Sequence, residues 1–309
     1  MKPIILDVDT GIDDALAIAY AVRSPALEVL GITTCFGNVP VEEASRNSLI
    51  VLDYLDSGVP VFQGAAHPLV RPYSGEKAVA VHGEDGLGGR ADIEPKRGVE
   101  PVSAVDFIIG RVKERPNEVT LICVGTLTNL ALALMKAPEI AGLIGRVVIM
   151  GGAVTVPGNV TPWAEANVIN DPEAADFVFR SGVPITLVGL DVTMKTLLPE
   201  EALAEWRAKG TRLGDFMADI AAFYIGCYKR NYPGIRGCGL HDPLAVGVVI
   251  DPSFVKTRPL HVQVDLEGEL SFARTVGDLR DVPEKEPNMD VCLKVDADRF
   301  LRHFLDNAV

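Results

Sequence analysis

The sequence contains few cysteines and arranges none of them as a metal or redox motif. Five cysteines are spread over 309 residues, and none forms a CxxC pair: Cys35, Cys123, Cys227, Cys238 and Cys292. Three of the five, Cys35, Cys123 and Cys292, lie inside apolar segments, as buried free thiols do. An odd number in so long a chain favours free thiols in a reducing compartment over a disulfide framework.

Long apolar runs and excess positive charge are also absent. The most apolar stretch, residues 119–135, is interrupted by Gly125, Thr126, Thr128 and Asn129, so we expect no membrane span. The chain has 42 acidic and 29 basic residues and a formal charge of −13. Because a net-negative surface does not attract nucleic acids or anionic membranes, we expect neither as a partner. No signal-peptide pattern precedes the first apolar run, and we expect a cytoplasmic protein.

Motifs that bind nucleotide phosphates are missing as well. No GxGxxG follows a predicted strand and no GK[ST] occurs, which leaves a dinucleotide site or a P-loop unsupported. An EF-hand is excluded because Ile12 stands where that loop requires glycine. The candidate binding loops contain no Lys/Arg cluster, which favours an uncharged ligand over a phosphate. The nearest basic residues, Arg71 and Arg90, receive no role from the sequence.

The stretch DVDTGIDDALAI, residues 7–18, places four carboxylates within eight residues: Asp7, Asp9, Asp13 and Asp14. An apolar run precedes it and a helical apolar pattern follows it, so it predicts a strand, a tight turn and a helix. Carboxylates at this density repel one another unless a cation lies among them. Helix capping explains one aspartate but not four. Because oxygen ligands suit Ca²⁺ or Mg²⁺, the sequence predicts a divalent-metal site after the first strand.

Apolar runs alternate with helical patterns through the first two thirds of the chain. Strands are predicted at 3–8, 27–34, 60–62, 118–124, 145–150 and 184–190, and helices at 13–23, 41–57, 101–115, 128–137 and 171–181. This alternation predicts an α/β fold with an open, mostly parallel, Rossmann-like sheet flanked by helices. Two more helices are expected within 199–231, and a small antiparallel addition at the C-terminus has strands around 261–274 and 290–295 and a helix at 296–307. No linker or repeat interrupts residues 1–309, and we expect a single domain.

Polar turns follow several of these strands, at 35–38, 125–129 and 150–152. In parallel sheets, ligands bind beyond the carboxyl ends of the strands, so these turns are expected to form one site with the aspartates. Two long loops, 63–100 and 151–170, add candidates. The first contains His82, for which a site residue and a surface histidine are equally good interpretations. The second contains Asn159, Glu165 and Asn167, which suit a polyhydroxylated ligand or an ordinary solvated loop.

His241 and Asp242 open an apolar helix in the last third of the chain. Asp242 is either a helix cap or a further carboxylate that returns to the metal. His241 beside it has a side chain able to act as an acid or a base near neutral pH. The preceding helix carries Tyr224 and Tyr228 four residues apart, a spacing typical of a core-facing helix.

Together these segments resemble the nucleoside hydrolases of the inosine-uridine-preferring type. The resemblance covers nearly the whole chain and rests on DVDTGIDDALAI, FGN (36–38), HGEDGLGG (82–89), VGTLTNLALA (124–133), MGG (150–152), GNVTPWAEANVINDPEAA (158–175) and HDPLAV (241–246). Two positions differ: Thr10 stands where the family often has proline, and Gly125-Thr126 where it often has Gly-Pro or Gly-Gly. Both lie in loops where the side chain need not touch a ligand, so the expected chemistry is unaffected.

The resemblance implies calcium-dependent hydrolysis of the N-glycosidic bond of ribonucleosides to ribose and free base. The Ca²⁺ ligands that it implies are Asp9, Asp14, Asp242 and the backbone carbonyl of Val124, completed by the ribose 2′- and 3′-hydroxyls. A metal-bound water would attack C1′, with Asp9 as its general base. The resemblance also implies a homo-oligomer, because members of this family form dimers or tetramers.

The resemblance further implies which residues contact the substrate. Polar side chains would hold the ribose: Asp13, Asn38 and Asn167 at the 2′- and 3′-hydroxyls, and Asn159, Glu165 and Met150 around the 5′-hydroxymethyl group. His241 would protonate or hydrogen-bond the leaving base. The pocket for that base would be lined by His82, Tyr224 and Tyr228.

Two other functions stay open on the residues alone. The start DVDT also resembles the haloacid-dehalogenase-type phosphatases, in which Asp7 would be the nucleophile and Mg²⁺ the cofactor. That interpretation leaves Asp13, Asp14 and the His241-Asp242 pair without a role. A non-catalytic nucleoside-binding protein is the second alternative, and it would not need both Asp9 and His241.

Overall fold

A computed structural model describes the whole chain, residues 1–309. Its centre is a sheet of eight strands in the order β3-β2-β1-β4-β5-β6-β12-β9. The strands are β1 (Lys2–Val8), β2 (Leu27–Thr34), β3 (Val61–Gln63), β4 (Thr120–Cys123), β5 (Arg146–Met150), β6 (Ile185–Val188), β9 (Val255–Leu260) and β12 (Met289–Val295). Every neighbouring pair is parallel except β12 and β9. The predicted α/β fold with a mostly parallel sheet is confirmed.

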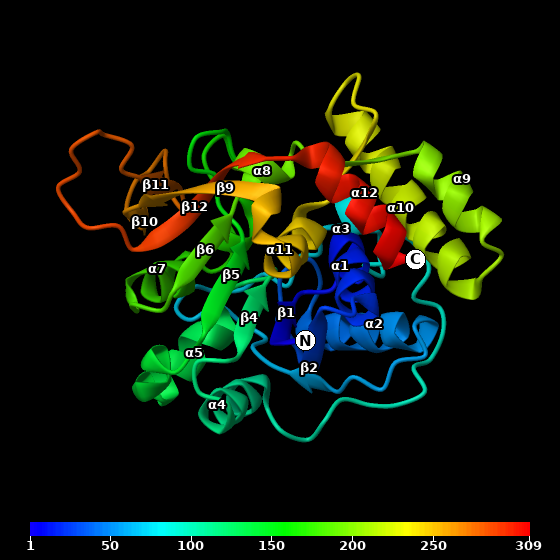
Figure 1. Cartoon of the computed structure of the whole chain (residues 1–309), viewed down its shortest axis with the longest axis horizontal. Helices are drawn as coiled ribbons and strands as arrows, with labels where there is room; N and C mark the ends of the chain where they lie inside the picture. The colour runs from blue at the N-terminus through cyan, green and yellow to red at the C-terminus, as the bar shows by residue number, and fades with distance from the viewer.

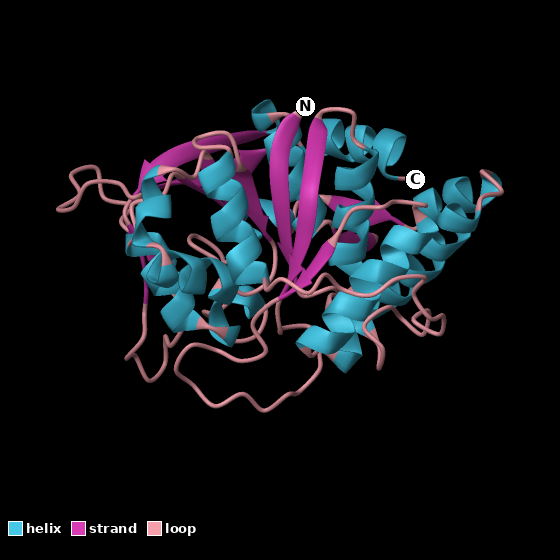
Figure 2. Ribbon diagram, turned by 90° about the horizontal axis from the view of Figure 1, so that it is seen from below, coloured by secondary structure: helices cyan, strands magenta, loops and turns pink.

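Helices cover both faces of the sheet (Figures 1 and 2). One side carries α1 (Ile12–Arg23), α2 (Val41–Tyr54), α9 (Glu201–Ala208), α10 (Arg212–Asn231), α11 (His241–Ile250) and α12 (Ala297–Ala308). The other side carries α4 (Ala104–Glu114), α5 (Thr128–Lys136) and α7 (Pro172–Arg180). Two separate clusters of buried apolar side chains fill the space between the sheet and the two helical layers.

The central strands form where the sequence is continuously apolar. In β1 the side chains of Ile4, Ile5 and Leu6 are fully buried, because helices cover the sheet on both faces. The first helix after the 151–170 loop begins as its sequence predicts. Asp171 accepts a hydrogen bond from the Ala174 amide and Pro172 occupies the first turn of α7.

The C-terminal segment contributes two strands, β9 and β12, to the main sheet and forms a separate two-stranded sheet. The antiparallel strands expected around 261–274 are a short hairpin, β10 (Val262–Val264) with β11 (Thr275–Gly277). Residues 290–295 instead lie in β12, which pairs in parallel with β6 and antiparallel with β9. The local pattern could not reveal this position, because the parallel partner of β12 lies about a hundred residues earlier in the chain.

Several short elements escape prediction because they are too brief to show a period. These are α3 (Val79–His82), α6 (Ala166–Asn170), α8 (Leu190–Thr193), the antiparallel pair β7 (Leu197–Pro199) and β8 (Gly237–Gly239), and the 3₁₀ turns η1 (Pro138–Gly142) and η2 (Pro252–Phe254). Both α3 and α6 lie inside the two long loops. Those loops therefore carry local structure that fixes their side chains.

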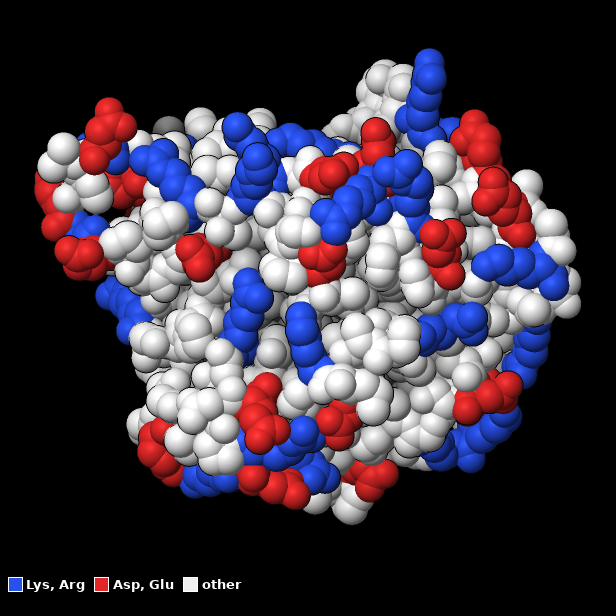
Figure 3. Space-filling model, in the orientation of Figure 1, with Lys and Arg blue, Asp and Glu red and all other residues white.

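The surface is of mixed charge. On the face shown in Figure 3, Lys and Arg side chains are interspersed with Asp and Glu and form no continuous basic area. None of the helices is both long and apolar enough to cross a lipid bilayer. All five cysteines are free and buried.

Candidate active site

The segments that follow β1, β2, β4 and β5 meet the start of α11 at one edge of the sheet. They form a cavity of about 190 Å³ whose lining includes most of the residues expected from the sequence: Asp13, Asn38, His82, Val124, Met150, Asn159, Glu165, Asn167, Tyr224, Tyr228, His241 and Asp242. Asp9 and Asp14 do not line this cavity but lie against it, in contact with Asn38. The structure therefore brings together all the side chains that the sequence proposes for the site.

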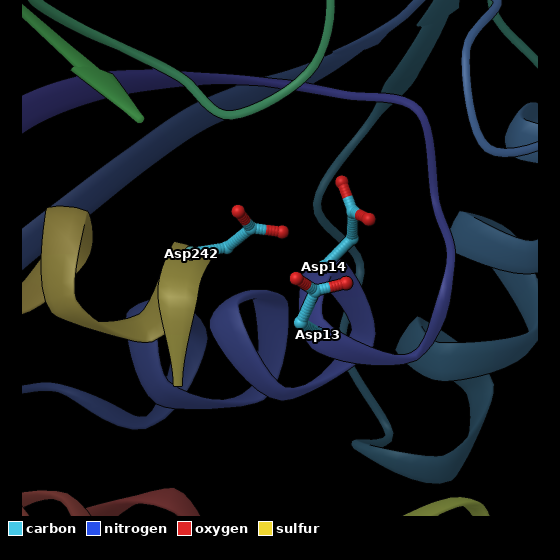
Figure 4. A group of neighbouring side chains, drawn as sticks. All are labelled: Asp13, Asp14 and Asp242. Carbon is cyan, nitrogen blue, oxygen red and sulfur yellow. The ribbon is translucent and has the colours of Figure 1, made fainter. Parts of the chain in front are cut away.

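Three carboxylates converge at one end of this cavity. Asp13 and Asp14 come from the first turn of α1, and Asp242 comes from the first turn of α11 and points toward them (Figure 4). One oxygen of each lies within 4.8 Å of the others, and all three residues are buried. Both helix starts favour negative charge through their backbone N–H groups, but this offsets only part of the repulsion.

Asp9 joins this group through the turn after β2. Its Oδ2 accepts a 2.7 Å hydrogen bond from the Asn38 amide N–H, and the Asn38 side-chain Nδ2 donates to Asp9 Oδ1 and to Asp14 Oδ2, both at 3.2 Å. Gly37 makes this approach possible, since a Cβ there would overlap Asp9 Oδ2. The expected metal ligand Asp9 thus lies beside Asp14, although it is not in the tightest group of three.

The carboxylates have no positive partner within the protein. None of the ion pairs formed by Lys and Arg includes Asp9, Asp13, Asp14 or Asp242. Burial, followed by the charge of Asp14, raises the pKa of Asp13 to about 8. Burial and the neighbouring aspartates likewise raise the pKa values of Asp9 and Asp242 well above their usual range.

This donor set fits a hard divalent cation. The buried Oδ1 of Asp13 has no hydrogen-bond partner, and a carboxylate oxygen left bare in the interior is costly. Oxygen donors from three to four carboxylates match the preference of Ca²⁺ or Mg²⁺ and not that of zinc. The expected fourth ligand, the Val124 carbonyl, accepts a 2.6 Å hydrogen bond from Asn167 Nδ2.

Glu165 and Asn159, which are expected near the 5′-hydroxymethyl group of a ribose, accept hydrogen bonds from backbone amides. Glu165 caps α6: its two oxygens accept from the amides of Gly152, Asn167 and Val168 at 2.8, 2.9 and 3.2 Å. Burial raises the pKa of this carboxyl group. Asn159 Oδ1 accepts from the Ala166 amide at 3.1 Å. These bonds hold the two side chains in fixed positions at the wall of the cavity.

Two imidazoles and two phenols, of His82, His241, Tyr224 and Tyr228, form what we call the aromatic end of the cavity, which meets the carboxylates where the Tyr224 hydroxyl donates to Asp13 Oδ2 at 3.3 Å. The Ile12 amide donates a 3.0 Å hydrogen bond to His82 Nδ1, and the His82 ring stacks on Tyr224 with centroids 5.5 Å apart. A 2.5 Å hydrogen bond joins the Tyr228 hydroxyl and His241 Nε2. Burial lowers the pKa of His82 to about 3 and that of His241 to about 4. Both rings are therefore neutral at physiological pH.

Asp7, the remaining carboxylate of residues 7–18, is bonded to residues of β2 and α5. Asp7 is fully buried, and its Oδ1 accepts from Thr33 Oγ1 at 2.5 Å and from Asn129 Nδ2 at 2.8 Å. It does not line the cavity. Arg71 and Arg90 form ion pairs with Glu173 and Asp219, and so attach the long loop to α7 and α10.

Sequence reasoning missed four residues at the aromatic end. Cys227 and Asn231 line the cavity from α10, and Tyr232 lines it from the residue directly after that helix. They follow Tyr224 and Tyr228 at helical steps, so this spacing, taken together with the pocket role that the resemblance implies for the two tyrosines, could have identified them. Thr193 in α8, whose Oγ1 lies 2.7 Å from His241 Nδ1, gave no such signal, because a four-residue helix shows no period.

Comparison with known proteins agrees with this arrangement. A family model described as inosine-uridine preferring nucleoside hydrolase matches residues 4–302. The chain is 38% identical over 301 residues to the pyrimidine-specific ribonucleoside hydrolase RihB of Escherichia coli strain K12, covering 97% of this chain and 94% of that protein. A purine-preferring ribonucleoside hydrolase from Gardnerella vaginalis has a solved structure that is 45% identical, with a TM-score of 0.95 and coverage of 99% and 98%. A plant nucleoside hydrolase, PpNRh1, is 33% identical with a TM-score of 0.94 and the same coverage. The chain belongs to the family of inosine-uridine preferring nucleoside hydrolases, enzymes that hydrolyse N-glycosidic bonds.

Proposed function

We propose that this enzyme hydrolyses ribonucleosides to ribose and free nucleobase with the help of a bound Ca²⁺ ion. The observation that carries the proposal is the division of one cavity between a carboxylate cluster and a neutral imidazole–phenol group. The carboxylate cluster would stabilise a transition state in which the ribose becomes cationic. The imidazole–phenol group would supply the proton that the departing base needs.

The ion would be held by Asp9, Asp14, Asp242 and the carbonyl of Val124. A divalent cation at this point would supply charge that lowers the pKa of a bound water and orients the ribose hydroxyls. Asp13 is an additional candidate ligand, since its Oδ1 is bare and lies in the tightest acidic group. Calcium fits a site with many carboxylate oxygens and flexible coordination better than magnesium does.

Asp9 is the proposed general base. Its carboxylate would accept a proton from the water that attacks C1′, as the C1′–N bond breaks and its electron pair moves to the base nitrogen. The position of Asp9 supports this role, because the backbone and side chain of Asn38, a cavity-lining residue, hold its carboxylate against the cavity. His241 would assist departure of the base through Tyr228, whose hydroxyl is in contact with it.

The ribose is proposed to bind through the polar wall of the cavity. Asp13, Asn38 and Asn167 face the metal end and would contact the 2′- and 3′-hydroxyls, while Met150, Asn159 and Glu165 would surround the 5′-hydroxymethyl group. His82, Tyr224 and Tyr228 would line the base pocket. The absence of Lys and Arg from the cavity lining supports a nucleoside over a nucleotide, since a phosphate needs cationic partners.

We also propose a cytoplasmic homo-oligomer, a dimer or a tetramer. Five buried free thiols and no disulfide suit a reducing compartment. Sedimentation equilibrium on the purified protein tests the assembly, and a single monomeric species would contradict it.

The test of the proposed function is ribose release from inosine, uridine, cytidine and adenosine. Activity should disappear with EDTA and return with excess Ca²⁺, and Mg²⁺ added in parallel identifies the ion. The assay also ranks the bases, for which the relatives named pyrimidine-specific and purine-preferring give opposite expectations. Absence of ribose release from all four substrates in the presence of Ca²⁺ would overturn the proposal.

A further inference from the structure

His241 lies between two buried hydroxyl groups, of which that of Thr193 is fully enclosed and that of Tyr228 borders the cavity. A 2.5 Å hydrogen bond joins its Nε2 to the Tyr228 hydroxyl, and a 2.7 Å bond joins its Nδ1 to Thr193 Oγ1. Thr193 is completely buried, and the bond to His241 is the only one its hydroxyl forms. No carboxylate contacts either ring nitrogen, so a neutral hydroxyl takes the position that an acidic residue often occupies behind a catalytic histidine.

Hydrogen-bond accounting selects one tautomer of the ring. If Nδ1 carried the proton, it would donate to Thr193 Oγ1, and the hydroxyl proton of Thr193 would have no acceptor in a fully buried site. Such an unpaired donor costs free energy, and buried polar groups in proteins are nearly always satisfied. If Nδ1 is bare, Thr193 donates to it, and the only hydroxyl proton without a close acceptor is that of Tyr228, which borders the cavity and not the closed interior. Nε2 then carries the proton and donates to the Tyr228 oxygen.

This tautomer determines where the Tyr228 proton points. With His241 Nε2–H donating to its oxygen, the Tyr228 O–H cannot be directed at the imidazole. Its other neighbour is the Tyr224 hydroxyl, at a long 3.5 Å, while Tyr224 itself lies 3.3 Å from Asp13 Oδ2 and can donate there. The Tyr228 proton is thus left for a ligand in the cavity that Tyr228 lines.

We infer that Thr193 sets the tautomer of His241 and thereby makes Tyr228, rather than His241, the group that gives its proton to the leaving base. This inference rests on the proposed nucleoside hydrolysis. As the C1′–N bond breaks, the base takes the proton of Tyr228, and the phenolate oxygen that forms accepts a hydrogen bond from His241 Nε2–H. Solvent returns a proton to Tyr228 after the base leaves. Thr193 is a positioning residue in this scheme, because it acts through His241 and touches no substrate.

The space around the Tyr228–His241 contact is kept free by a glycine. Gly239 in β8 lies against it, and a Cβ at that position would come within 2.6 Å of His241 Nε2 and 2.9 Å of the Tyr228 oxygen. Burial raises the pKa of Tyr228 well above its ordinary value, so the phenol retains its proton until the base draws on it. A donor to the phenol oxygen reduces the cost of that transfer.

The first test is spectroscopic and independent of turnover. Long-range ¹H–¹⁵N spectra of the full-length enzyme labelled at histidine nitrogens distinguish a protonated ring nitrogen from a bare one. His82 is an internal reference, because its Nδ1 accepts the Ile12 amide proton and its own proton must be on Nε2. We expect His241 to give the same pattern as His82. A His241 spectrum with the proton on Nδ1 would overturn the inference even if the enzyme is fully active.

The second test uses Thr193→Val, which removes the hydroxyl and retains the shape. We expect kcat for inosine to fall about 10- to 100-fold, as for loss of a buried hydrogen bond, while KM changes by less than about threefold. Hydrolysis of 4-nitrophenyl riboside should fall by less than about threefold, because its leaving group needs no proton. This substrate also separates the inference from the proposed function, since an inactive enzyme would fail on both.

Two variants complete the design. Thr193→Ser restores the hydroxyl and is expected to recover inosine turnover to within about threefold of wild type and to retain the His241 spectrum. Thr196→Val removes a buried hydroxyl three residues away, which donates to the Thr193 carbonyl and not to His241, and it should leave both readouts unchanged. Equal losses on the two substrates in Thr193→Val, or equal effects of Thr193→Val and Thr196→Val, would overturn the inference.

Discussion

At one end of the cavity three carboxylates lie within 4.8 Å of one another with no basic residue beside them, whereas at the other end both imidazoles have only neutral hydrogen-bond partners. Burial acts on both ends, but in opposite directions. It raises the pKa of Asp13 to about 8 and lowers that of His82 to about 3, because in each case the interior disfavours the charged form.

The difference indicates what each end still needs. The carboxylate end is complete only with an external cation, since its charges have no internal partner. The aromatic end needs no ion, because the hydrogen-bond partners of both imidazoles are neutral. A ligand with a hydroxyl-rich half and a flat heterocyclic half matches such a division, as a ribonucleoside does.

The largest effect on activity is expected when one carboxylate of the acidic group is replaced. Asp242→Asn removes one negative charge from the acidic group and should abolish Ca²⁺ binding measured by calorimetry and lower kcat/KM for ribose release by about 10³-fold. Asp106→Asn is the matched control, because Asp106 also stands in the first turn of a helix but is paired with Lys136 far from the cavity. Unchanged Ca²⁺ affinity in Asp242→Asn would contradict the metal site.

A somewhat smaller and more selective effect is expected at the aromatic end. His241→Ala removes the donor to Tyr228 and should lower turnover of inosine about 10²- to 10³-fold while that of 4-nitrophenyl riboside falls much less. His303→Ala, which removes a histidine bonded to Tyr20 outside the cavity, should affect neither substrate. An equal loss on both substrates would mean that His241 has no part in departure of the base.

These two predictions differ in how far the sequence alone supports them. The carboxylates are adjacent in the chain and follow a recognisable strand, so their convergence could be predicted from the rule for parallel sheets. For Asp242 the residues alone left a helix cap and a metal ligand open, and only the resemblance favoured the ligand, because 228 residues separate it from Asp14. Tyr228 and His241 were both identified from the sequence, but the bond between them was not, since no local pattern specifies which side of α10 faces the start of α11.

The parts of the structure that sequence could not provide share one cause. Thr193 lies on a four-residue helix, and β12 joins the main sheet through β6, so both depend on contacts between distant segments. Periodicity reports which face of an element is buried but not which element covers it. The fold could therefore be predicted from the sequence pattern, whereas the residues that lie behind the proposed catalytic groups could not.

An intermediate effect is expected where space, not charge, is changed at the aromatic end. Gly239→Ala would bring a Cβ within 2.6 Å of His241 Nε2, and we expect inosine turnover to fall about tenfold as the Tyr228–His241 bond lengthens. Gly226→Ala on α10 is the control, because its Cβ would make only an ordinary 3.6 Å contact with Arg230. Wild-type activity in Gly239→Ala would show that this short contact is not needed.

The smallest effect concerns the pH dependence of folding stability, to which the imidazoles and the buried carboxylates contribute with opposite signs. The pKa of His82 is lowered to about 3 by burial, so between pH 6.5 and 3 the unfolded chain binds a proton that the folded chain does not. Stability contributed by His82 is present above pH 6.5 and is lost on acidification, by at most about 1.4 kcal/mol per pH unit.

Buried carboxylates such as Asp13 act in the opposite sense, since their raised pKa values make the metal-free fold more stable as the pH falls through about 8. The two contributions separate in His82→Gln, in which Gln Oε1 can still accept the Ile12 amide proton but cannot titrate. Urea unfolding of the metal-free protein at pH 6.5, 5.5 and 4.5 should give a smaller loss of stability on acidification in the variant than in wild type. Parallel curves for the two proteins would mean that His82 is protonated in the folded state, and the neutral character of the aromatic end would then rest on His241 alone.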